Sequence, residues 1–540
     1  MECSAGRSQG MDRLDGVTRR QFLATAGAGL AALSAGRIAG AAPPSRGNKP
    51  NVIYFYSDTH RWGAMSFTQE SAVKTPYMEQ MLSNGVSMDR CYVNLPICTP
   101  YRGILFSGRW PWQQGIMANH MILAERPDMP SGKKYRGTLG WMFKDARYNT
   151  GYFGKSHWGS NDVRPYGFDK STIGSGGDHT KIRFKEDGVT QPTWHRGTSD
   201  DSNCTPVVTE ALEWIDAQYD APEPFFAVIA VHPPHGTMTD APDGKLALYP
   251  DETAMPYHPY DKRHDFAQHQ GYHAHISDVD DEINRVLVKM NELGITNDTI
   301  FIYTSDHGGM SGVKGAGYVA KRHPEDESTR VPFLIQWPGK IPTDVRLNTL
   351  FSTIDHFPTL CKLANLPIHL AAAGTSDALE SLDYLNASPG VDLSGNILGT
   401  GGPDPESVFI MHPSNMNKKG GPPGWAPVTR GVVTKEWTYA VGPEEEYCLY
   451  SNTGEYQYPD LLGEAGYDNI RHALWELIRE WMKTAEDPSI DTWFAKMPMS
   501  RVRAWNEEHG FGDVADREIG KAAIFDIMKS EPSVPKKRRA

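Results

Sequence analysis

Cysteine is scarce in this sequence, with 6 residues in a chain of 540. Small secreted domains that depend on disulfides are much richer in cysteine, so a disulfide-held scaffold is excluded. Cys3 lies in an N-terminal segment that we expect to be removed, and an odd number of thiols then remains. At least one of these needs an explanation other than disulfide pairing; they are Cys91, Cys98, Cys204, Cys361 and Cys448.

Long apolar runs and blocks of positive charge are also missing. No stretch approaches the ~20 apolar residues that a membrane-spanning helix needs, so we expect no membrane association of the mature protein. The net charge is −12 and is spread along the chain, which provides no electrostatic attraction to nucleic acid. If the substrate is an anion, the cationic side chains that bind it must be gathered locally.

Residues 1–41 have the pattern of an export signal. Arg19 and Arg20 precede a weakly hydrophobic stretch rich in Ala and Gly at 24–35, and Ala39-Gly40-Ala41 offers a small-residue cleavage site. This pattern is typical of a twin-arginine signal peptide. We therefore expect the twin-arginine translocase of a bacterium as a partner, and a periplasmic or secreted location.

Residues 48–400 have the pattern of one large α/β domain. Short apolar runs bounded by turn residues predict buried strands, and apolar residues at helical spacing predict a helix at 272–293, stopped by Gly294. Their alternation predicts a large, mostly parallel but mixed sheet with helices on both faces. The strands are predicted at 51–56, 225–231, 299–304 and 331–337.

The pattern changes near Thr400. Three short apolar runs predict a small antiparallel sheet, and a strongly amphipathic segment at 469–484 predicts one long helix. We expect these elements to form a smaller C-terminal α+β domain at 401–515, followed by a tail at 516–540. The short strands are predicted at 407–411, 429–433 and 437–441.

Three strands of the large sheet are followed by polar residues of an unusual kind. In open α/β sheets, ligands bind beyond the carboxyl ends of the strands. We therefore expect these carboxylates and imidazoles to meet and form a site for a hard cation, although each alone could be a turn residue or a structural histidine. They are Asp58, Thr59 and His60 after the first strand, His235 after the second, and Asp306 and His307 after the third.

Two further segments carry cations and a cysteine. In an extended segment, Lys155 and His157 would point to the same side, and a cation beside an imidazole suits binding of a multiply charged oxyanion. In the segment 98–109, Pro100 stands at a plausible first helical position and Gly108 at the stop. Cys98 would then lie just before a helix N-terminus, where backbone N–H groups and the helix dipole favour an anion.

The run Cys98-Thr99-Pro100-Tyr101-Arg102, with Gly108-Arg109, resembles the signature of type I sulfatases of the alkaline phosphatase superfamily, whose cysteine is oxidised to formylglycine (3-oxoalanine). The resemblance extends from Asn51 to about Thr484. It implies an alkaline-phosphatase-like fold and a formylglycine-generating maturation enzyme as a partner. Further motifs follow in the family's order: residues 51–58, Gly154 to Gly159, Pro234-His235, Thr304 to Gly308, Lys321, Arg330-Val331-Pro332 and, less specifically, Glu446 to Tyr450.

The resemblance implies hydrolysis of a sulfate ester on a small molecule or glycan. One hydroxyl of the hydrated formylglycine would attack sulfur and form a covalent sulfo-enzyme, and the other would then expel sulfate. Among the matching residues, Cys98 would be the precursor of the nucleophile, and Arg102 and Lys155 would bind both the formylglycine and the sulfate oxygens. His235 would protonate the leaving oxygen, with Lys321 close to the same atom. His157 would accept the proton of the second hydroxyl.

The implied metal is Ca²⁺, but the ligand set departs from the family's commonest pattern. Thr59 stands where a second acidic or amide residue is usual, and His307 where an asparagine is usual. An imidazole suits Mn²⁺ better than Ca²⁺, so Mn²⁺ stays open, as does a compensating role for His60. The implied ligands are Asp58, Thr59, Asp306, His307 and the residue formed from Cys98.

Two alternative functions stay open. A phosphodiesterase or phosphonate monoester hydrolase of the same superfamily would share the fold, the metal ligands and even formylglycine. A non-catalytic glycan-binding protein would leave Cys98 as a packed thiol, but it would need no leaving-group acid such as His235. A sulfated carbohydrate is the expected substrate, as an inference from the family alone.

Overall fold

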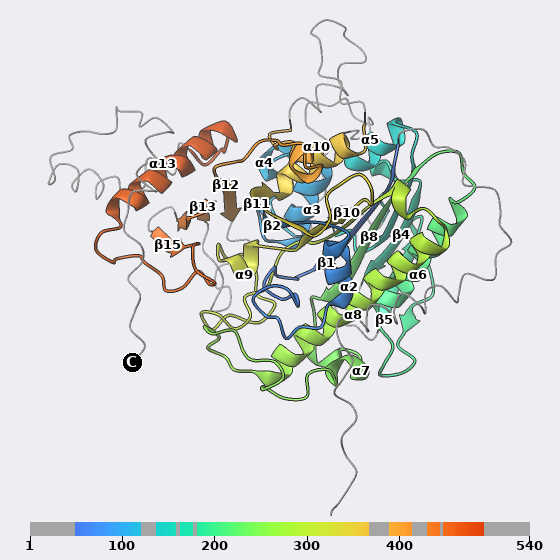
Figure 1. The fold of residues 1–540 in the computed structure, drawn as a ribbon, viewed down its shortest axis with the longest axis horizontal. Helices are drawn as coiled ribbons and strands as arrows, with labels where there is room; N and C mark the ends of the chain where they lie inside the picture. The colour runs from blue at the N-terminus through green and yellow to red at the C-terminus, as the bar shows by residue number, and fades with distance from the viewer. Residues whose placement is uncertain are drawn as a thin grey trace, which may run out of the picture. The chain divides into compact units, whose positions relative to one another are not determined.

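The computed structural model describes residues 49–119, 137–157, 162–175, 181–366, 388–412, 429–442 and 446–490. The predicted signal peptide at 1–41 and the predicted tail at 516–540 lie outside these residues. The described chain contains a large sheet, drawn from blue to yellow in Figure 1, and a small sheet drawn in orange and brown.

The centre of the large sheet consists of four parallel strands in the order β9, β1, β8 and β3. They are β1 (Asn51–Asp58), β3 (Asn149–Gly154), β8 (Phe225–Pro234) and β9 (Thr299–Ser305). Strands β1, β8 and β9 form here because each is largely an apolar run buried on both faces, whereas β3 carries Asn149, Thr150 and Gly151 before its aromatic residues. Neighbouring parallel strands end at the same edge of a sheet, so their carboxyl ends are brought together.

The outer strands make the sheet mixed. Strand β10 pairs antiparallel with both β9 and β2, whereas β11 runs parallel to β2, and β4 runs parallel to β3. The prediction of a mostly parallel but mixed sheet is confirmed. The outer strands are β2 (Gly85–Tyr92), β4 (Lys170–Ser175), β5 (Lys181–Glu186), β6 (Val189–Thr190), β7 (Trp194–His195), β10 (Phe333–Gln336) and β11 (Val345–Ser352).

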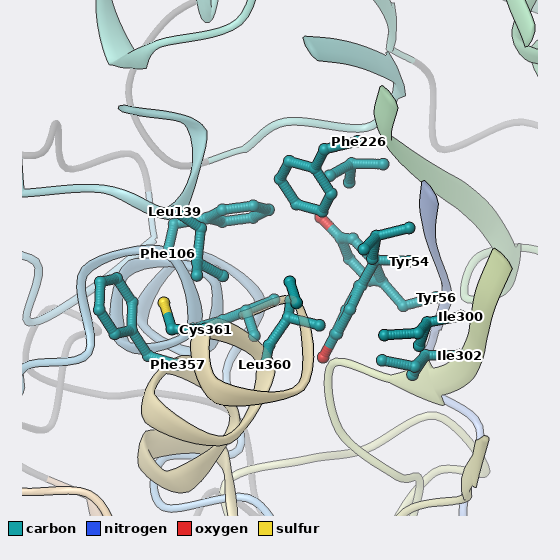
Figure 2. Packing of buried hydrophobic residues seen from close by; sticks show 14 of the residues in the cluster. Tyr54, Tyr56, Phe106, Leu139, Phe226, Ile300, Ile302, Phe357, Leu360 and Cys361 are labelled. Carbon is teal, nitrogen blue, oxygen red and sulfur yellow. The ribbon is translucent and has the colours of Figure 1, made fainter. Parts of the chain in front are cut away.

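Helices cover both faces of the large sheet, as predicted. Alternate residues of β1 face opposite sides: Tyr54 packs in the cluster that includes α10, and Phe55 in the cluster that includes α8. Figure 2 shows part of the first cluster, in which Leu360 of α10 lies near Tyr54 of β1. One face carries α3 (Cys98–Ser107), α5 (Leu139–Asp145) and α10 (Thr353–Leu363), and the other α2 (Pro76–Ser83), α6 (Cys204–Ala217) and α8 (Phe266–Glu292).

Helix α8 begins six residues before the predicted start at 272. The side chain of Asp265 accepts a hydrogen bond from the backbone N–H of Gln268 and caps the first turn. This first turn buries His269 rather than an aliphatic residue, which is why the apolar pattern does not reveal it.

The small sheet is antiparallel, as predicted, and has the strand order β12, β13, β14, β15. Its apolar core is shared with helix α3 of the large sheet and with the start of α4, since Ile104 of α3 and Trp110 before α4 belong to the same cluster as Phe409 and Leu474. The domain limits at 48–400 and 401–515 stay predictions. The elements are β12 (Val408–His412), β13 (Thr429–Val433), β14 (Trp437–Val441), β15 (Glu446–Ser451) and α13 (Asp468–Thr484), and the short helices elsewhere are α4 (Pro111–Gln114), α7 (Asp243–Leu246), α9 (Asp326–Thr329) and α12 (Ser394–Ile397).

The remaining cysteines are consistent with the absence of a disulfide framework. All five thiols from Cys91 to Cys448 lie in described segments, are buried and are unpaired. In those segments no helix is both long and apolar enough to cross a membrane.

Candidate active site

The ends of the four central strands form the floor of the site. Asp58 is the last residue of β1 and is paired with Pro234 of β8. Next to it, the backbone N–H of Asp306 donates to the carbonyl of Ser57 at 3.1 Å, which continues the β1–β9 pairing by one residue. The strand-end residues predicted to meet therefore do so because the sheet's own hydrogen bonds place their backbones.

Cys98 lies at the first position of α3, which begins two residues earlier than the predicted start at Pro100. The helix ends at Ser107 and Gly108 stops it, as predicted; this glycine has the left-handed conformation (φ 61°) that it adopts without steric cost. The Cys98 Sγ atom is buried and lies 3.0 Å from Lys321 Nζ, 3.3 Å from His307 Nε2 and 3.8 Å from Asp58 Oδ1.

The surroundings of Cys98 favour an anion. Burial and the Asp58 carboxylate raise the pKa of the thiol, but Lys321, Lys155 and the His307 imidazole outweigh them, so the pKa lies well below its usual range. Burial would lower the pKa of Lys321, yet the negative charges beside it hold that pKa above its usual value. The position next to the helix N-terminus is thus surrounded by cations that suit an oxyanion.

Arg102 holds the two strand-end carboxylates together from one helical turn below Cys98. Its Nη2 atom lies 2.9 Å from Asp306 Oδ2 and 3.3 Å from Asp58 Oδ2, and all three side chains are buried. The Nη1 atom donates to the Tyr56 hydroxyl at 3.1 Å. Tyr56 in turn is hydrogen-bonded to the Tyr152 hydroxyl at 2.6 Å.

Sequence reasoning missed these two tyrosines. Tyr56 and Tyr152 lie inside apolar strands, where an aromatic residue has the pattern of ordinary core. Arg322 was also missed. It follows Lys321, and burial lowers its pKa, an effect that negative charge on the Cys98 sulfur opposes. Its position next to Lys321 was the only available indication.

Lys155 and His157 both reach the site, but not through the extended geometry that we predicted. Strand β3 ends at Gly154 (φ 96°), although the Lys155 N–H still donates to Ala230 at 2.8 Å, and His157 has a left-handed backbone (φ 52°). Lys155 Nζ forms an ion pair with Asp58. His157 is hydrogen-bonded to Cys98, and burial lowers the pKa of its imidazole.

Four donor groups are close enough to hold one metal ion: Asp58, Cys98, Asp306 and His307 have ligand atoms within 4.8 Å of one another. The His307 Nδ1 atom lies 2.9 Å from the carbonyl oxygen of Gly308. A carbonyl can only accept, so Nδ1 carries the proton and the Nε2 lone pair faces the cluster. An imidazole oriented in this way and two carboxylates suit a divalent cation.

The two carboxylates also have the electrostatics of a cation site. Burial and the neighbouring Asp58 raise the pKa of Asp306 to about 6. Burial likewise raises the pKa of Asp58, but Lys155 and its other cationic neighbours hold it well below the usual range. Two buried carboxylates this close repel each other, and a divalent cation between them would relieve that repulsion.

Thr59 and His60 have other partners. The Thr59 hydroxyl donates to Asp58 Oδ1 at 2.9 Å, and its carbonyl accepts from the Tyr272 hydroxyl at 2.8 Å. His60 Nδ1 lies 2.7 Å from the Tyr303 hydroxyl, and Nε2 lies 2.9 Å from the Ala64 carbonyl. Both nitrogens of His60 are therefore engaged away from the cluster, so this side chain does not replace the missing acidic residue.

His235 lies close enough to Lys321 for the charge of the ammonium to affect its imidazole. It follows the end of β8 directly, and its N–H donates to the carbonyl of His232 at 3.1 Å. Burial and the neighbouring Lys321 charge lower the pKa of His235 to about 3. An anionic ligand would offset the Lys321 charge and make protonation of this imidazole easier.

Comparison with known proteins finds one family over most of the large sheet. Residues 50–366 match the Sulfatase family model. An ulvan-active sulfatase of Formosa agariphila is 28% identical over 443 residues, covering 79% of this chain and 80% of the relative. An endo-4-O-sulfatase of Bacteroides thetaiotaomicron is 24% identical over 503 residues, covering 84% and 94%.

Solved structures share the same fold. A Bacteroides fragilis structure assigned provisionally as the sulfatase YidJ superposes with a TM-score of 0.69 at 21% identity, covering 84% of this chain and 99% of that one. The phosphonate monoester hydrolase of Agrobacterium radiobacter superposes with a TM-score of 0.63 at 18% identity, covering 81% and 96%. The alkaline-phosphatase-like fold predicted from the sequence is confirmed.

Proposed function

Because the chain belongs to the sulfatase family and is a sulfuric ester hydrolase, we propose that it removes sulfate from a carbohydrate by attack of a formylglycine hydrate derived from Cys98, through a covalent sulfo-enzyme intermediate. The observation that carries this proposal is the position of Cys98 at the start of α3, 3.0 Å from Lys321 Nζ and 3.3 Å from His307 Nε2. Relatives that act on ulvan or are named endo-4-O-sulfatase support a glycan substrate.

The side chains around Cys98 have separate tasks in this proposal. Lys155 and Arg102 hold the nucleophile and the sulfate oxygens, where negative charge is rearranged in the transition state. His235 protonates the leaving alcohol, and the Lys321 ammonium stabilises the same oxygen. His157 accepts the proton of the second hydroxyl when sulfate leaves. An ordinary serine has no second hydroxyl and would stay trapped as a sulfate ester.

We infer that Ca²⁺ occupies the cluster, held by Asp58, Asp306, His307 and the residue at position 98, with Thr59 as a further candidate. The ion would lower the pKa of the attacking hydroxyl and polarise the sulfate. Removing it with a chelator should abolish turnover and lower the melting temperature. Ca²⁺ at about 100 times its Kd should restore about 2.7 kcal/mol of stability. Recovery with Mn²⁺ alone would instead assign the site to Mn²⁺.

Maturation and export are part of the same proposal. A formylglycine-generating enzyme would act on Cys98 in the unfolded chain, since the thiol is buried in the folded protein. The arginine pair at 19–20 supports export by the twin-arginine translocase to a periplasmic or secreted location. Fusing residues 1–41 to a reporter tests this: export should fail when both arginines are replaced by lysine.

The mass of the tryptic peptide that contains Cys98 tests the nucleophile directly. Protein co-expressed with a maturation enzyme should show the aldehyde or its hydrate in place of the thiol. An unmodified thiol, despite maturation of a control sulfatase in the same cells, would contradict the mechanism and favour a glycan-binding protein. Faster turnover of phosphonate or phosphate diesters than of sulfate esters would instead favour the phosphonate hydrolase alternative, whose fold this chain shares.

A further inference from the structure

Lys321 is carried by a long irregular loop. Between β9, which ends at Ser305, and α9, which begins at Asp326, the fully described chain contains no helix or strand. Loops of this length are usually functional, and other contacts must hold them in place. Backbone hydrogen bonds join Met310 to Ala320 at 2.9 Å and Ser311 to Tyr318 at 3.2 Å.

Glu325 closes this loop around Lys321. It follows Lys321 by four residues and is fully buried. Its Oε1 atom lies 2.5 Å from the Nζ of Lys314, which precedes Lys321 by seven residues. Burial would raise the pKa of Glu325, but Lys314 and His323 hold it below its usual value. The ion pair therefore joins the two sides of the loop that carries Lys321.

The small sheet holds this ion pair from outside the loop. The hydroxyl of Tyr450 on β15 donates to Glu325 Oε1 at 2.9 Å, and the hydroxyl of Tyr447 lies 3.2 Å from His323 Nδ1. The Lys314 ammonium lies over both rings, 5.0 Å from the centre of Tyr447 and 5.3 Å from that of Tyr450. All these contacts come from the tyrosine-bearing motif at 446–450, for which the proposed mechanism has no task.

We propose that Glu325 is a positioning residue and that Tyr450 and Tyr447 hold it, so that the small sheet sets the position of Lys321 beside Cys98. This inference rests on the proposed sulfatase mechanism. The Lys321 Nζ atom lies 3.0 Å from the Cys98 Sγ atom. Even a small shift of a positioned group can cost much of its contribution to the transition state.

The leaving alcohol determines how much this position matters. An alkyl or sugar alkoxide is much more basic than nitrophenolate, whose ring delocalises the negative charge, so its departure depends more strongly on stabilisation by Lys321 and His235. Displacing Lys321 should therefore slow sugar sulfates more than nitrophenyl sulfate. A merely structural defect would reduce the active fraction of the enzyme and slow both substrates equally.

Tyr450→Phe in the mature enzyme tests the inference, because it removes only the hydroxyl that reaches Glu325. We expect kcat/KM for a sugar sulfate to fall about 10–100-fold, and for 4-nitrophenyl sulfate by less than about threefold. The matched control is Tyr439→Phe, which removes a hydroxyl on the neighbouring strand β14 that donates to Glu446 Oε1 at 2.5 Å. The control should leave the ratio of the two rates unchanged.

Equal losses on both substrates, or an equal change of the ratio in the control, would overturn the inference. Glu325→Gln is a second variant in case Tyr450→Phe folds poorly. It can still accept from Tyr450 but no longer attracts Lys314 by charge, so it should change the ratio in the same direction. If the matured wild-type enzyme hydrolyses neither ester, the proposed function itself fails, and this outcome is distinct from a selective loss in a variant.

Discussion

The two sides of the candidate site are built in different ways. Asp58 is the last residue of a parallel strand, and Asp306 and Lys155 directly follow two others; the hydrogen bonds of the sheet fix their backbones. Lys321 instead lies on a loop that side chains from a second sheet hold in place. The sheet edge positions its groups through regular geometry, whereas the loop depends on a few specific contacts.

This difference predicts different responses to mutation. Changes at Asp58, Asp306, Cys98 or Arg102 should affect every substrate, since they would remove the proposed metal site, the proposed nucleophile or the proposed sulfate contacts. Changes at the loop and the small sheet should depend on the leaving group. The following predictions test this contrast, beginning with the largest expected effect.

Cys98→Ala should lower kcat by at least about 10⁴-fold on every ester, because it removes the precursor of the group proposed to attack sulfur. Its melting temperature in the presence of Ca²⁺ should stay close to that of the wild type. Cys98→Ser, measured by intact mass, should accumulate protein heavier by one SO₃ group after exposure to substrate. Repeated turnover by the alanine variant would show that Cys98 is not the precursor of the nucleophile.

Arg102→Lys should lower kcat/KM by about 10²–10³-fold for sugar and aryl sulfates alike. A lysine keeps the charge but cannot reach Asp58, Asp306 and Tyr56 at once, as the planar guanidinium does. Arg164→Lys is the control, since Arg164 is an exposed residue paired with Asp162 at 2.8 Å. A loss confined to the substrate with the poorer leaving group would contradict the contrast between the two sides.

Arg430→Met should destabilise the small sheet by about 3–5 kcal/mol, because it leaves the buried Asp487 carboxylate without its partner. Arg430 Nη2 lies 3.1 Å from Asp487 Oδ1, and both side chains are buried. The control Arg479→Met removes a more exposed pair with Glu476 on α13 and should cost less than about 1 kcal/mol. Chemical denaturation measures both values.

The same Arg430→Met protein sharpens the comparison of the two sides when its activity is measured. Under conditions in which most of the variant is still folded, kcat/KM should fall more for sugar sulfates than for 4-nitrophenyl sulfate, because the small sheet supports the Lys321 loop. An equal fall in kcat/KM for both substrates would show that this sheet contributes only stability.

His356→Gln should have the smallest effect on turnover; what it should change is the pH dependence of stability. Burial lowers the pKa of His356 to about 3, against about 6.5 in an unfolded chain. Between about pH 3 and pH 6.5 this histidine is protonated in the unfolded chain but neutral in the folded protein. The stability that the neutral, buried imidazole contributes is therefore complete above about pH 6.5 and is lost as the pH falls toward 3. In the variant, the free energy of unfolding should change less steeply with pH over this range, by up to about 1.4 kcal/mol per pH unit.

The surroundings of His356 differ from those of an exposed histidine, which serves as the control for this pH test. Its imidazole lies 2.7 Å from the Tyr54 hydroxyl and 3.6 Å from Cys91 Sγ, on the face of the large sheet that α10 covers. The exposed His195 on β7 provides the control, and His195→Gln should leave the slope unchanged. An unchanged slope in His356→Gln would show that this imidazole can be protonated in the folded protein.

The floor of the site was predictable because it follows from local periodicity and sheet topology. An apolar run followed by Asp58 or by Asp306-His307 predicts both a buried strand and the polar residues at its end. Lys155 and His157 were also identified, but the geometry offered for them was wrong, since the left-handed backbone at Gly154 and His157 interrupts the alternation of an extended strand.

The sequence by itself determined the large α/β sheet, the small antiparallel sheet and the set of residues at the strand ends, because repeating patterns of apolar residues encode all three. Tertiary structure alone decided that Tyr56 and Tyr152 support Arg102, that His60 is bonded elsewhere, and that Tyr450 reaches Glu325. The physical reason is that these contacts join residues far apart in the chain. They depend on how sheets and loops pack, and no local pattern records that packing.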